Sequence, residues 1–265
     1  MKHPLQQIAI VLVEPTHPGN VGAVARAMKT MGLSDLRLVN PLKFPHYEAT
    51  KRAAGADDVL EAAQCYGSLV EAVAQCTRVI GTSVREREVT WPTYSPRDTA
   101  EQLMPHLCEQ TDDSSTPASA AIVFGRESSG LTNEELDLCD AQIRISANED
   151  YSSLNLGSAV QIICYEMRLA ALATRHGDGV NAEPAEAGRL TPAQERQLPA
   201  GKQMREQHLE HLAVVLNKLD FIKSKPPTML LRKLTRLYNK AELSIEEIHI
   251  LRGILTAVEQ VIERK

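Results

Sequence analysis

The sequence lacks a Cys-x-x-Cys pair, and we expect it to contain neither a secretory leader nor a membrane-spanning run. We expect no segment to reach the roughly 20 apolar residues that a membrane helix needs, and the apolar stretch near Met1 is too short for a signal peptide. The five cysteines are scattered, which is typical of a reducing compartment and predicts no zinc site. We therefore expect a cytoplasmic protein with no membrane partner and no bound metal.

Two common glycine motifs of nucleotide-binding proteins are also missing. Gly19-Asn20-Val21-Gly22 follows the first predicted strand without continuing as G-x-G-x-x-G, and no acidic residue ends the second strand at Val39-Asn40. The phosphate-binding pattern G-x-x-x-x-G-K-[ST] is absent as well. These absences disfavour a dinucleotide oxidoreductase and a nucleotide hydrolase.

Charge is unevenly distributed along the chain, whose net charge is −5. Residues 1–200 carry 17 Lys and Arg against 26 Asp and Glu, whereas residues 201–265 carry 12 against 8. A dense basic patch attracts phosphates whatever the net charge, although a solvated helix face fits the same pattern. The candidate RNA-binding residues of this region are Lys218, Lys223, Lys225, Arg232, Lys233, Arg236 and Lys240.

Apolar runs alternate with helical patterns over the first 175 residues. Continuously apolar strands separated by helices predict an α/β fold, with a mostly parallel sheet covered by helices on both faces. The predicted strands are Ile8–Val13, Leu36–Val39, Arg78–Thr82, Ala120–Phe124 and Ala141–Ile145. The predicted helices are Val21–Met31, Ser68–Ala74, Arg97–His106, Thr132–Leu138 and Asn155–Arg175, and three helix starts carry a capping-box pattern, at Ser68, Thr132 and Ser244.

The composition changes after residue 175. Residues 176–201 are rich in Gly, Pro, Ala and Glu, which predicts a flexible linker. Residues 202–265 repeat leucine and isoleucine at spacings of three and four, which predicts a small all-α module with a middle helix at Met229–Asn239. We therefore expect an α/β domain over 1–175, a linker over 176–201 and a helical module over 202–265.

Three distant segments combine glycine with small polar residues: His17-Pro18-Gly19-Asn20 with Arg26, then Val123 to Leu131, then Tyr151 to Ser158. The first two directly follow predicted strands, and strand–glycine–helix is how an α/β protein presents backbone amides to a ligand. Singly, each has a plainer interpretation: a surface arginine, a loop before a capped helix, and an N-cap cluster. Together they predict one composite site, in which we expect Arg126 and Glu127 to brace their loop.

The order, spacing and residue types of these segments resemble the three motifs of the SPOUT superfamily, in its branch of 2′-O-ribose RNA methyltransferases. The resemblance covers roughly residues 5–175. Two segments are similar in sequence to those of the bacterial enzymes that methylate cytidine or uridine 32 of the tRNA anticodon loop. They are Ser152-Ser153-Leu154-Asn155-Leu156 and Leu251-Arg252-Gly253-Ile254-Leu255.

The resemblance implies a deep C-terminal trefoil knot, S-adenosylmethionine as methyl donor, tRNA as substrate and a homodimer with its active site at the subunit interface. It implies catalytic roles for Asn20, Arg26, Glu127 and Ser153. The donor-binding positions that it implies are Thr82, Ser83, Val84, Gly125, Ile145, Ser152, Ser153 and Leu154.

We expect Arg26 to act electrostatically on the developing alkoxide or the adjacent phosphate, because a guanidinium stays protonated in proteins and is a poor general base. Two alternatives remain open. One is a related enzyme that acts on another tRNA or ribosomal RNA site, and the other is a non-catalytic RNA-binding protein.

Overall fold

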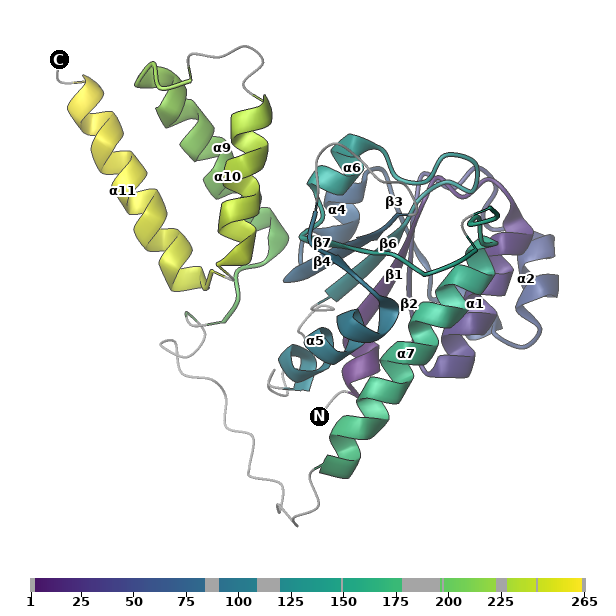
Figure 1. Ribbon diagram of the computed structural model, residues 1–265. Helices are drawn as coiled ribbons and strands as arrows, with labels where there is room; N and C mark the ends of the chain where they lie inside the picture. The colour runs from purple at the N-terminus through teal and green to yellow at the C-terminus, as the bar shows by residue number, and fades with distance from the viewer. Residues whose placement is uncertain are drawn as a thin grey trace. The chain divides into compact units, whose positions relative to one another are not determined.

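A computed structural model describes residues 3–83, 91–108, 120–148, 150–177, 196, 198–222, 228–241 and 243–263. The chain divides into two compact units, Met1–Ala187 and Gly188–Lys265 (Figure 1).

The first unit is built on a seven-stranded sheet in the order β3-β2-β1-β6-β4-β7-β5, and every pair of neighbours is parallel. The predicted parallel sheet is confirmed. β3 and β5 were not expected from the sequence, and β7 ends two residues earlier than predicted. The strands are β1 Ile8–Val13, β2 Asp35–Val39, β3 Gln64–Tyr66, β4 Arg78–Thr82, β5 Thr93–Tyr94, β6 Ala120–Phe124 and β7 Ala141–Ile143.

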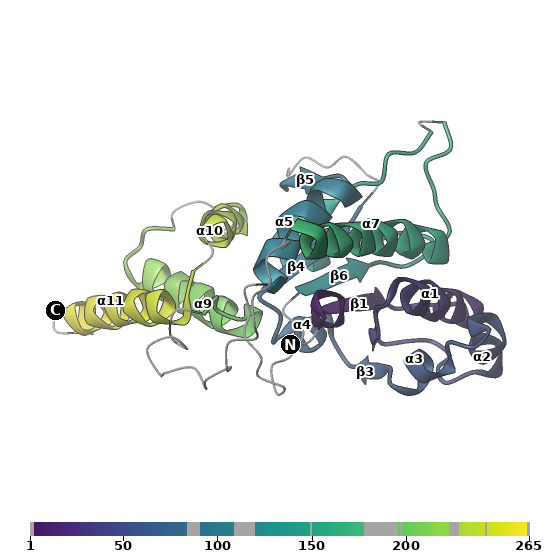
Figure 2. The ribbon, with the colours of Figure 1, turned by 90° about the horizontal axis from the view of Figure 1, so that it is seen from below.

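Helices cover both faces of this sheet, as predicted (Figures 1 and 2). Alternate side chains of β1 enter different cores: Ile10 packs on one face and Val11 on the other. One core is shared with helices α1 Pro18–Met31, α2 Tyr47–Ala53, α3 Asp57–Glu61, α5 Pro96–Cys108 and α7 Leu156–Gly177, and with the short 3₁₀ helix η1 Pro4–Gln7. The other is shared with α4 Leu69–Val73 and α6 Asn133–Asp137.

Helix starts follow local capping chemistry. Thr132 and Glu135 form the complete capping box that the sequence predicts at α6. α1 begins three residues before the predicted start, because Pro18 occupies its first position and His17 Nδ1 accepts a hydrogen bond from Gly19 N–H at 3.2 Å. The His17-Pro18-Gly19 segment is thus part of the helix start and not a loop before it.

Helix α7 corrects the expectation that no segment has the length and apolarity of a membrane span. Leu156–Thr174 reaches both, with a mean hydropathy of 1.2 over its most apolar window. Its inner face is nonetheless a core face, since Val160, Ile163 and Met167 are buried and α7 packs against α1 and α5. Gly157 lies against Ala23 of α1, where an added Cβ would come within 2.9 Å of the Ala23 Cβ. The small residue Gly157 in the first turn of α7 therefore permits a close approach to α1.

The second unit contains three helices among its described residues: α9 Lys202–Lys218, α10 Thr228–Lys240 and α11 Ile245–Glu263. Leu212, Val215 and Leu255 form its small buried core. Ser244 and Glu247 make the predicted capping box at α11, with Ser244 N–H donating to Glu247 at 2.8 Å and Glu247 N–H donating to Ser244 Oγ at 3.3 Å. The all-α character of this region is confirmed, and the trefoil knot of the first unit stays a prediction.

Candidate active site

The site lies where the strand order reverses. From β1 the chain moves outward to β2 and β3, whereas β6 and β4 lie on the other side of β1. The loops that follow β1 and β6 therefore leave the carboxyl ends of two adjacent strands and lead to helices on opposite faces of the sheet, and we call this junction the crevice. Ligands of open parallel sheets bind at such a switch point.

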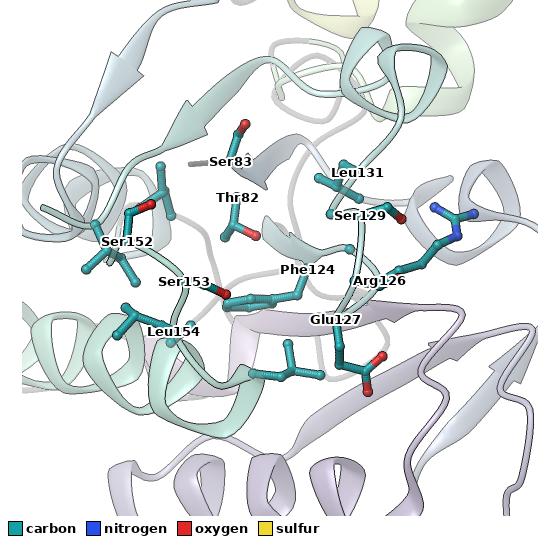
Figure 3. A pocket seen from close by; sticks show the side chains of 17 residues that line it. Thr82, Ser83, Phe124, Arg126, Glu127, Ser129, Leu131, Ser152, Ser153 and Leu154 are labelled. Atoms are coloured by element: carbon teal, nitrogen blue, oxygen red, sulfur yellow. The ribbon is translucent and has the colours of Figure 1, made fainter. Parts of the chain in front are cut away.

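A cavity of about 410 Å³ opens beside this crevice, at the carboxyl ends of β4, β6 and β7 (Figure 3). Its volume falls within the roughly 300–1,000 Å³ of small-molecule sites. Apolar side chains such as Phe124 and Ile143 line it together with several hydroxyl groups. Four loop regions contribute the lining, which comprises Thr82, Ser83, Phe124, Gly125, Arg126, Glu127, Ser128, Ser129, Gly130, Leu131, Ile143, Ile145, Ser152, Ser153, Leu154, Leu156 and Ala159.

Seven of the eight predicted donor-binding residues lie around this cavity: Thr82, Ser83, Gly125, Ile145, Ser152, Ser153 and Leu154. Val84 lies outside the described residues. Thr82 donates its hydroxyl to the carbonyl of Val123 at 3.1 Å, which ties the end of β4 to β6. Figure 3 shows Ser152, Ser153 and Leu154 on the side of the cavity opposite Ser129 and Arg126. The second and third motifs thus converge on one cavity.

The loop after β6 is closed on itself. Arg126 and Gly130 exchange backbone hydrogen bonds of 3.3 and 2.8 Å, and Gly130 has a positive φ of 71°. A Cβ added to Gly125 would lie 2.1 Å from the Gly130 carbonyl carbon, so only glycine fits under this turn. The loop is therefore preorganised, with its backbone facing the cavity.

The expected brace between Arg126 and Glu127 is wrong. Arg126 instead donates to Glu14 at 2.8 Å and, through two nitrogens, to Glu135 at 3.0 Å each. Figure 3 shows its guanidinium directed away from Ser152 and Ser153. Hydrogen bonds from Arg126 lower the pKa of Glu14, and those to Glu14 and Glu135 raise the pKa of Arg126. Arg126 therefore anchors the loop to the end of β1 and to α6. Glu127 does not pair with Arg126 and makes its hydrogen bonds in the crevice.

Glu127 is the centre of a hydrogen-bonded network across the crevice. Its Oε1 accepts from Asn20 Nδ2 at 3.1 Å, and its Oε2 accepts from Thr16 Oγ1 at 3.0 Å. Asn20 Oδ1 in turn accepts from Asn155 Nδ2 at 3.3 Å. Partial desolvation works against the charge, but the hydrogen bonds from Asn20 and Thr16 outweigh it and lower the pKa of Glu127. The network joins all three sequence motifs, and Thr16 is a member that the sequence analysis missed.

Arg26 lies elsewhere on α1. Its side chain is exposed and does not line the cavity. It follows Gly22 by one helical turn, and Gly22 faces α2 while Ala23 faces α7. Arg26 therefore stands on the exposed strip of α1 between these two helices, apart from the predicted donor-binding residues that line the cavity.

The predicted basic patch is only partly assembled within the described residues. Lys218 is turned toward α11, where it pairs with Glu259 at 2.7 Å and Glu263 at 3.8 Å. Arg232, Lys233 and Arg236 share α10, and Lys233 is exposed. Lys223, Lys225 and the side chain of Lys240 lie outside the described residues.

The described residues contain no group of three or more His, Cys, Asp or Glu side chains placed to hold a metal ion. The cavity is instead lined by glycines, hydroxyl-bearing residues and apolar side chains. Such a lining suits an organic ligand with a flat apolar part and several polar groups.

Residues 7–165 match the SpoU rRNA Methylase family, and residues 203–265 match the tRNA methyltransferase TrmJ, C-terminal domain. The chain is 45% identical to the tRNA (cytidine/uridine-2′-O-)-methyltransferase TrmJ of Salmonella typhimurium, over 97% of this chain and 98% of that one. It is 41% identical to the tRNA (cytidine/uridine/adenosine-2′-O-)-methyltransferase TrmJ of Pseudomonas aeruginosa, over 97% and 95%. The crystal structure of TrmJ from Z. mobilis ZM4 matches with a TM-score of 0.74 and 33% identity, over 95% of this chain and 98% of that one. The chain belongs to the SpoU methylase family and, within it, to the TrmJ tRNA methyltransferases.

Proposed function

We propose that the protein transfers a methyl group from S-adenosylmethionine to the ribose 2′-hydroxyl of cytidine or uridine at position 32 of the tRNA anticodon loop. The observation that carries this proposal is the convergence of the three motifs at the switch point, in a chain of this family. Glu127, Asn20 and Asn155 meet there beside a cavity lined by the donor-binding residues.

The cavity suits S-adenosylmethionine in shape and chemistry. Phe124, Ile143 and Leu154 provide apolar surface for an adenine ring, and the serine-bearing loops provide polar groups for its sugar and amino acid parts. The turn over Gly125 keeps backbone close to the ligand, since a Cβ there has no room. When bound, the donor supplies an electrophilic methyl group on a sulfonium, whose displacement leaves a neutral thioether.

The protein's own contribution is orientation and electrostatics. Holding a ribose hydroxyl in line with the methyl group removes much of the entropic barrier of the transfer. Asn20 and Glu127 fix the wall of the crevice, and Ser153 adds a hydroxyl to the cavity. Arg26 stabilises the negative charge that develops on the ribose oxygen or binds the adjacent phosphate, while the proton leaves to water or a phosphate oxygen. No metal takes part in this scheme.

In this proposal Arg26 acts on the donor of a second subunit, because it does not line the cavity of its own subunit. A homodimer is supported by α7, whose outer face carries an apolar stripe at helical spacing: Ile162, Tyr165, Leu169 and Leu172, each 37–48% exposed. The proposal is that this stripe pairs with a second copy and that Arg26 of one subunit then serves the cavity of the other.

The substrate tRNA also contacts the second unit in this proposal, through Lys233 and its neighbours on α10. Because tRNA is made and modified in the cytoplasm of bacteria, we assign the protein to that compartment.

The deciding experiment incubates the full chain with labelled S-adenosylmethionine and total tRNA, then maps the modified nucleotide. Label on the ribose of nucleotide 32 is expected. Label at another RNA position favours a related methyltransferase, and RNA binding without label supports a non-catalytic role.

A further inference from the structure

The segment from Leu42 to Arg52 forms an aromatic and basic surface that the reaction scheme leaves unused. Tyr47 is 74% exposed and Leu42 is 68% exposed. Lys43, Lys51 and Arg52 are exposed as well, and Glu48 is the single acid in this segment. These five side chains, Leu42, Lys43, Tyr47, Lys51 and Arg52, are called the α2 surface. It is locally cationic within a first unit that is acidic as a whole.

The α2 surface is attached to the crevice by backbone contacts. Leu42 N–H donates to the Pro15 carbonyl at 3.2 Å, and the next residue, Thr16, holds Glu127. α2 also packs directly on α1, where a Cβ on Gly22 would lie 2.1 Å from the Ala49 carbonyl oxygen. α1 lies between α2 and α7 in both ribbon views (Figures 1 and 2). The surface therefore flanks Arg26 on the side away from α7.

The exposed side chains of α2 do little for the fold. α2 buries Ala49 and Ala53 against α1, while Tyr47 is largely exposed and its ring makes a tilted contact with that of His46 at 5.5 Å. Lys51 follows Tyr47 by one helical turn, so the ring and the cation share a face. Glu48 is turned the other way, with its Oε1 3.9 Å from His17 Nε2 of the α1 cap. The outward face of α2 thus combines a flat aromatic ring with positive charge and is not opposed by that acid.

We propose that the α2 surface binds the single-stranded RNA next to the reacting nucleotide, with a base stacked on Tyr47 and phosphates held by Lys43 and Lys51. Stacking platforms flanked by cations are the general means of holding unpaired nucleotides, since every base has a π face. The position of the surface beside Arg26 fits a strand whose reacting nucleotide lies at Arg26. This inference rests on the proposed function and adds to it the surface that receives the strand.

The test uses the full chain and a tRNA transcript, with dissociation constants measured by fluorescence anisotropy at several salt concentrations. Tyr47→Ala is expected to weaken tRNA binding by roughly tenfold or more, whereas Tyr47→Phe keeps the ring and binds within about twofold of wild type. The pair Lys43→Gln with Lys51→Gln is expected to lower the slope of log affinity against log salt by about 0.7 for each lost phosphate contact. The matched pair Lys43→Arg with Lys51→Arg keeps both charges and should retain the wild-type salt slope. Arg52 is left unchanged, because its Cβ lies against α1.

Two controls separate this inference from the proposed function. The affinity for S-adenosylmethionine, measured by calorimetry, and the melting temperature should be the same in every variant. None of the substituted residues lines the cavity or is buried in the core. Suppose that the wild-type chain binds and methylates tRNA, and that Tyr47→Ala and the Gln pair bind tRNA with the same affinity as wild type. This result would overturn the inference and leave the proposed function intact. Equal losses in Tyr47→Phe and Tyr47→Ala would overturn the stacking assignment. A wild-type chain that neither binds nor methylates tRNA would instead overturn the proposed function.

Discussion

Asn20 and Glu127 are joined by a 3.1 Å hydrogen bond, although 107 residues separate them in the sequence. Asn20 belongs to the first turn of α1, and Glu127 belongs to the loop after β6. Their bond therefore spans the point at which the strand order reverses. It fixes the width of the crevice, so changes on either side should disturb the same chemistry.

The variant Glu127→Gln tests the charge at the centre of this bond network. The amide offers one oxygen where the carboxylate accepts hydrogen bonds from Asn20 and Thr16 through two. We expect methyl transfer to slow by at least roughly tenfold, since hydrogen bonds to charged groups are worth about 1.5–3 kcal/mol. Single-turnover rates measure this, with donor binding as the control, and an unchanged rate would remove Glu127 from the site.

The same pair of proteins predicts a pH dependence. The pKa of Glu127 in the folded chain lies below its ordinary value of 4.5. The stabilisation that its charge provides is therefore complete above that ordinary value and is lost as the pH falls through the lowered folded pKa. The difference in free energy of unfolding between wild type and Glu127→Gln should stay constant from neutral pH to about pH 5 and shrink below it. Denaturant titrations at each pH measure it, and a difference that grows on acidification would contradict the assignment.

Arg26→Lys keeps the positive charge and removes the planar guanidinium. We expect tRNA affinity to stay within about threefold of wild type and turnover to fall by roughly a hundredfold, because a fixed donor aimed at developing charge is worth that much. Lys29→Arg, one turn along α1, is the matched control, since its ion pair with Asp58 survives the exchange. Normal turnover in Arg26→Lys would exclude Arg26 from catalysis.

Gly125→Ala tests the preorganised loop. Its methyl group would lie 2.1 Å from the Gly130 carbonyl carbon, so the loop has to shift and the donor should bind at least roughly tenfold more weakly. Gly67→Ala is the control, because its Cβ would make only an ordinary 3.5 Å contact with Glu71. Calorimetry with S-adenosylmethionine decides the outcome, and equal affinities in the two variants would show that the loop does not hold the donor.

Leu169→Glu places a charge in the middle of the exposed stripe of α7. We expect a monomer in sedimentation experiments and little methyl transfer, with donor binding largely retained because Leu169 does not line the cavity. Arg168→Glu is unsuitable as a control, since Arg168 bonds to the Met31 carbonyl. Leu169→Met keeps the stripe apolar and should remain dimeric. A monomeric wild type would reject the shared site.

Lys233→Gln combined with Arg236→Gln tests the second unit. Both residues lie on α10 in the second compact unit, whereas the cavity is lined by residues of the first unit. We expect weaker tRNA binding with a reduced salt slope and unchanged donor affinity. An unaltered salt slope would support the alternative of a solvated helix face.

The sequence predicts most of this architecture where burial is strong. β1, β4 and β6 begin and end as expected, because β1 and β6 are continuous apolar runs and β4 has a buried apolar centre, and all three lie in the middle of the sheet. β3 and β5 escape prediction because Gln64–Tyr66 and Thr93–Tyr94 are short and partly exposed, so no apolar run marks them. α2 escapes because His46, an uncommon cap, replaces the Ser, Thr, Asp or Asn that usually marks a helix start.

The site shows the same division between local and distant information. Glu127, Asn20 and Asn155 can each be selected as candidate site residues from the local sequence, since each follows a strand or begins a helix. Their contact is set by the strand order, which no local pattern contains. The partners of Arg126 were misjudged for that reason, because Glu14 is 112 residues away and its position depends on β1 lying beside β6.

Asn155 performs two tasks with one side chain, and this limits which residues can replace it. Its Oδ1 caps α7 by accepting from Gly157 N–H at 3.0 Å, and its Nδ2 donates to Asn20 at 3.3 Å. Aspartate would cap the helix but set two acceptors against each other, and serine would cap it without reaching Asn20. Neither substitution therefore keeps both hydrogen bonds of Asn155. The same side chain is needed for the stability of the α7 start and for the arrangement of the site.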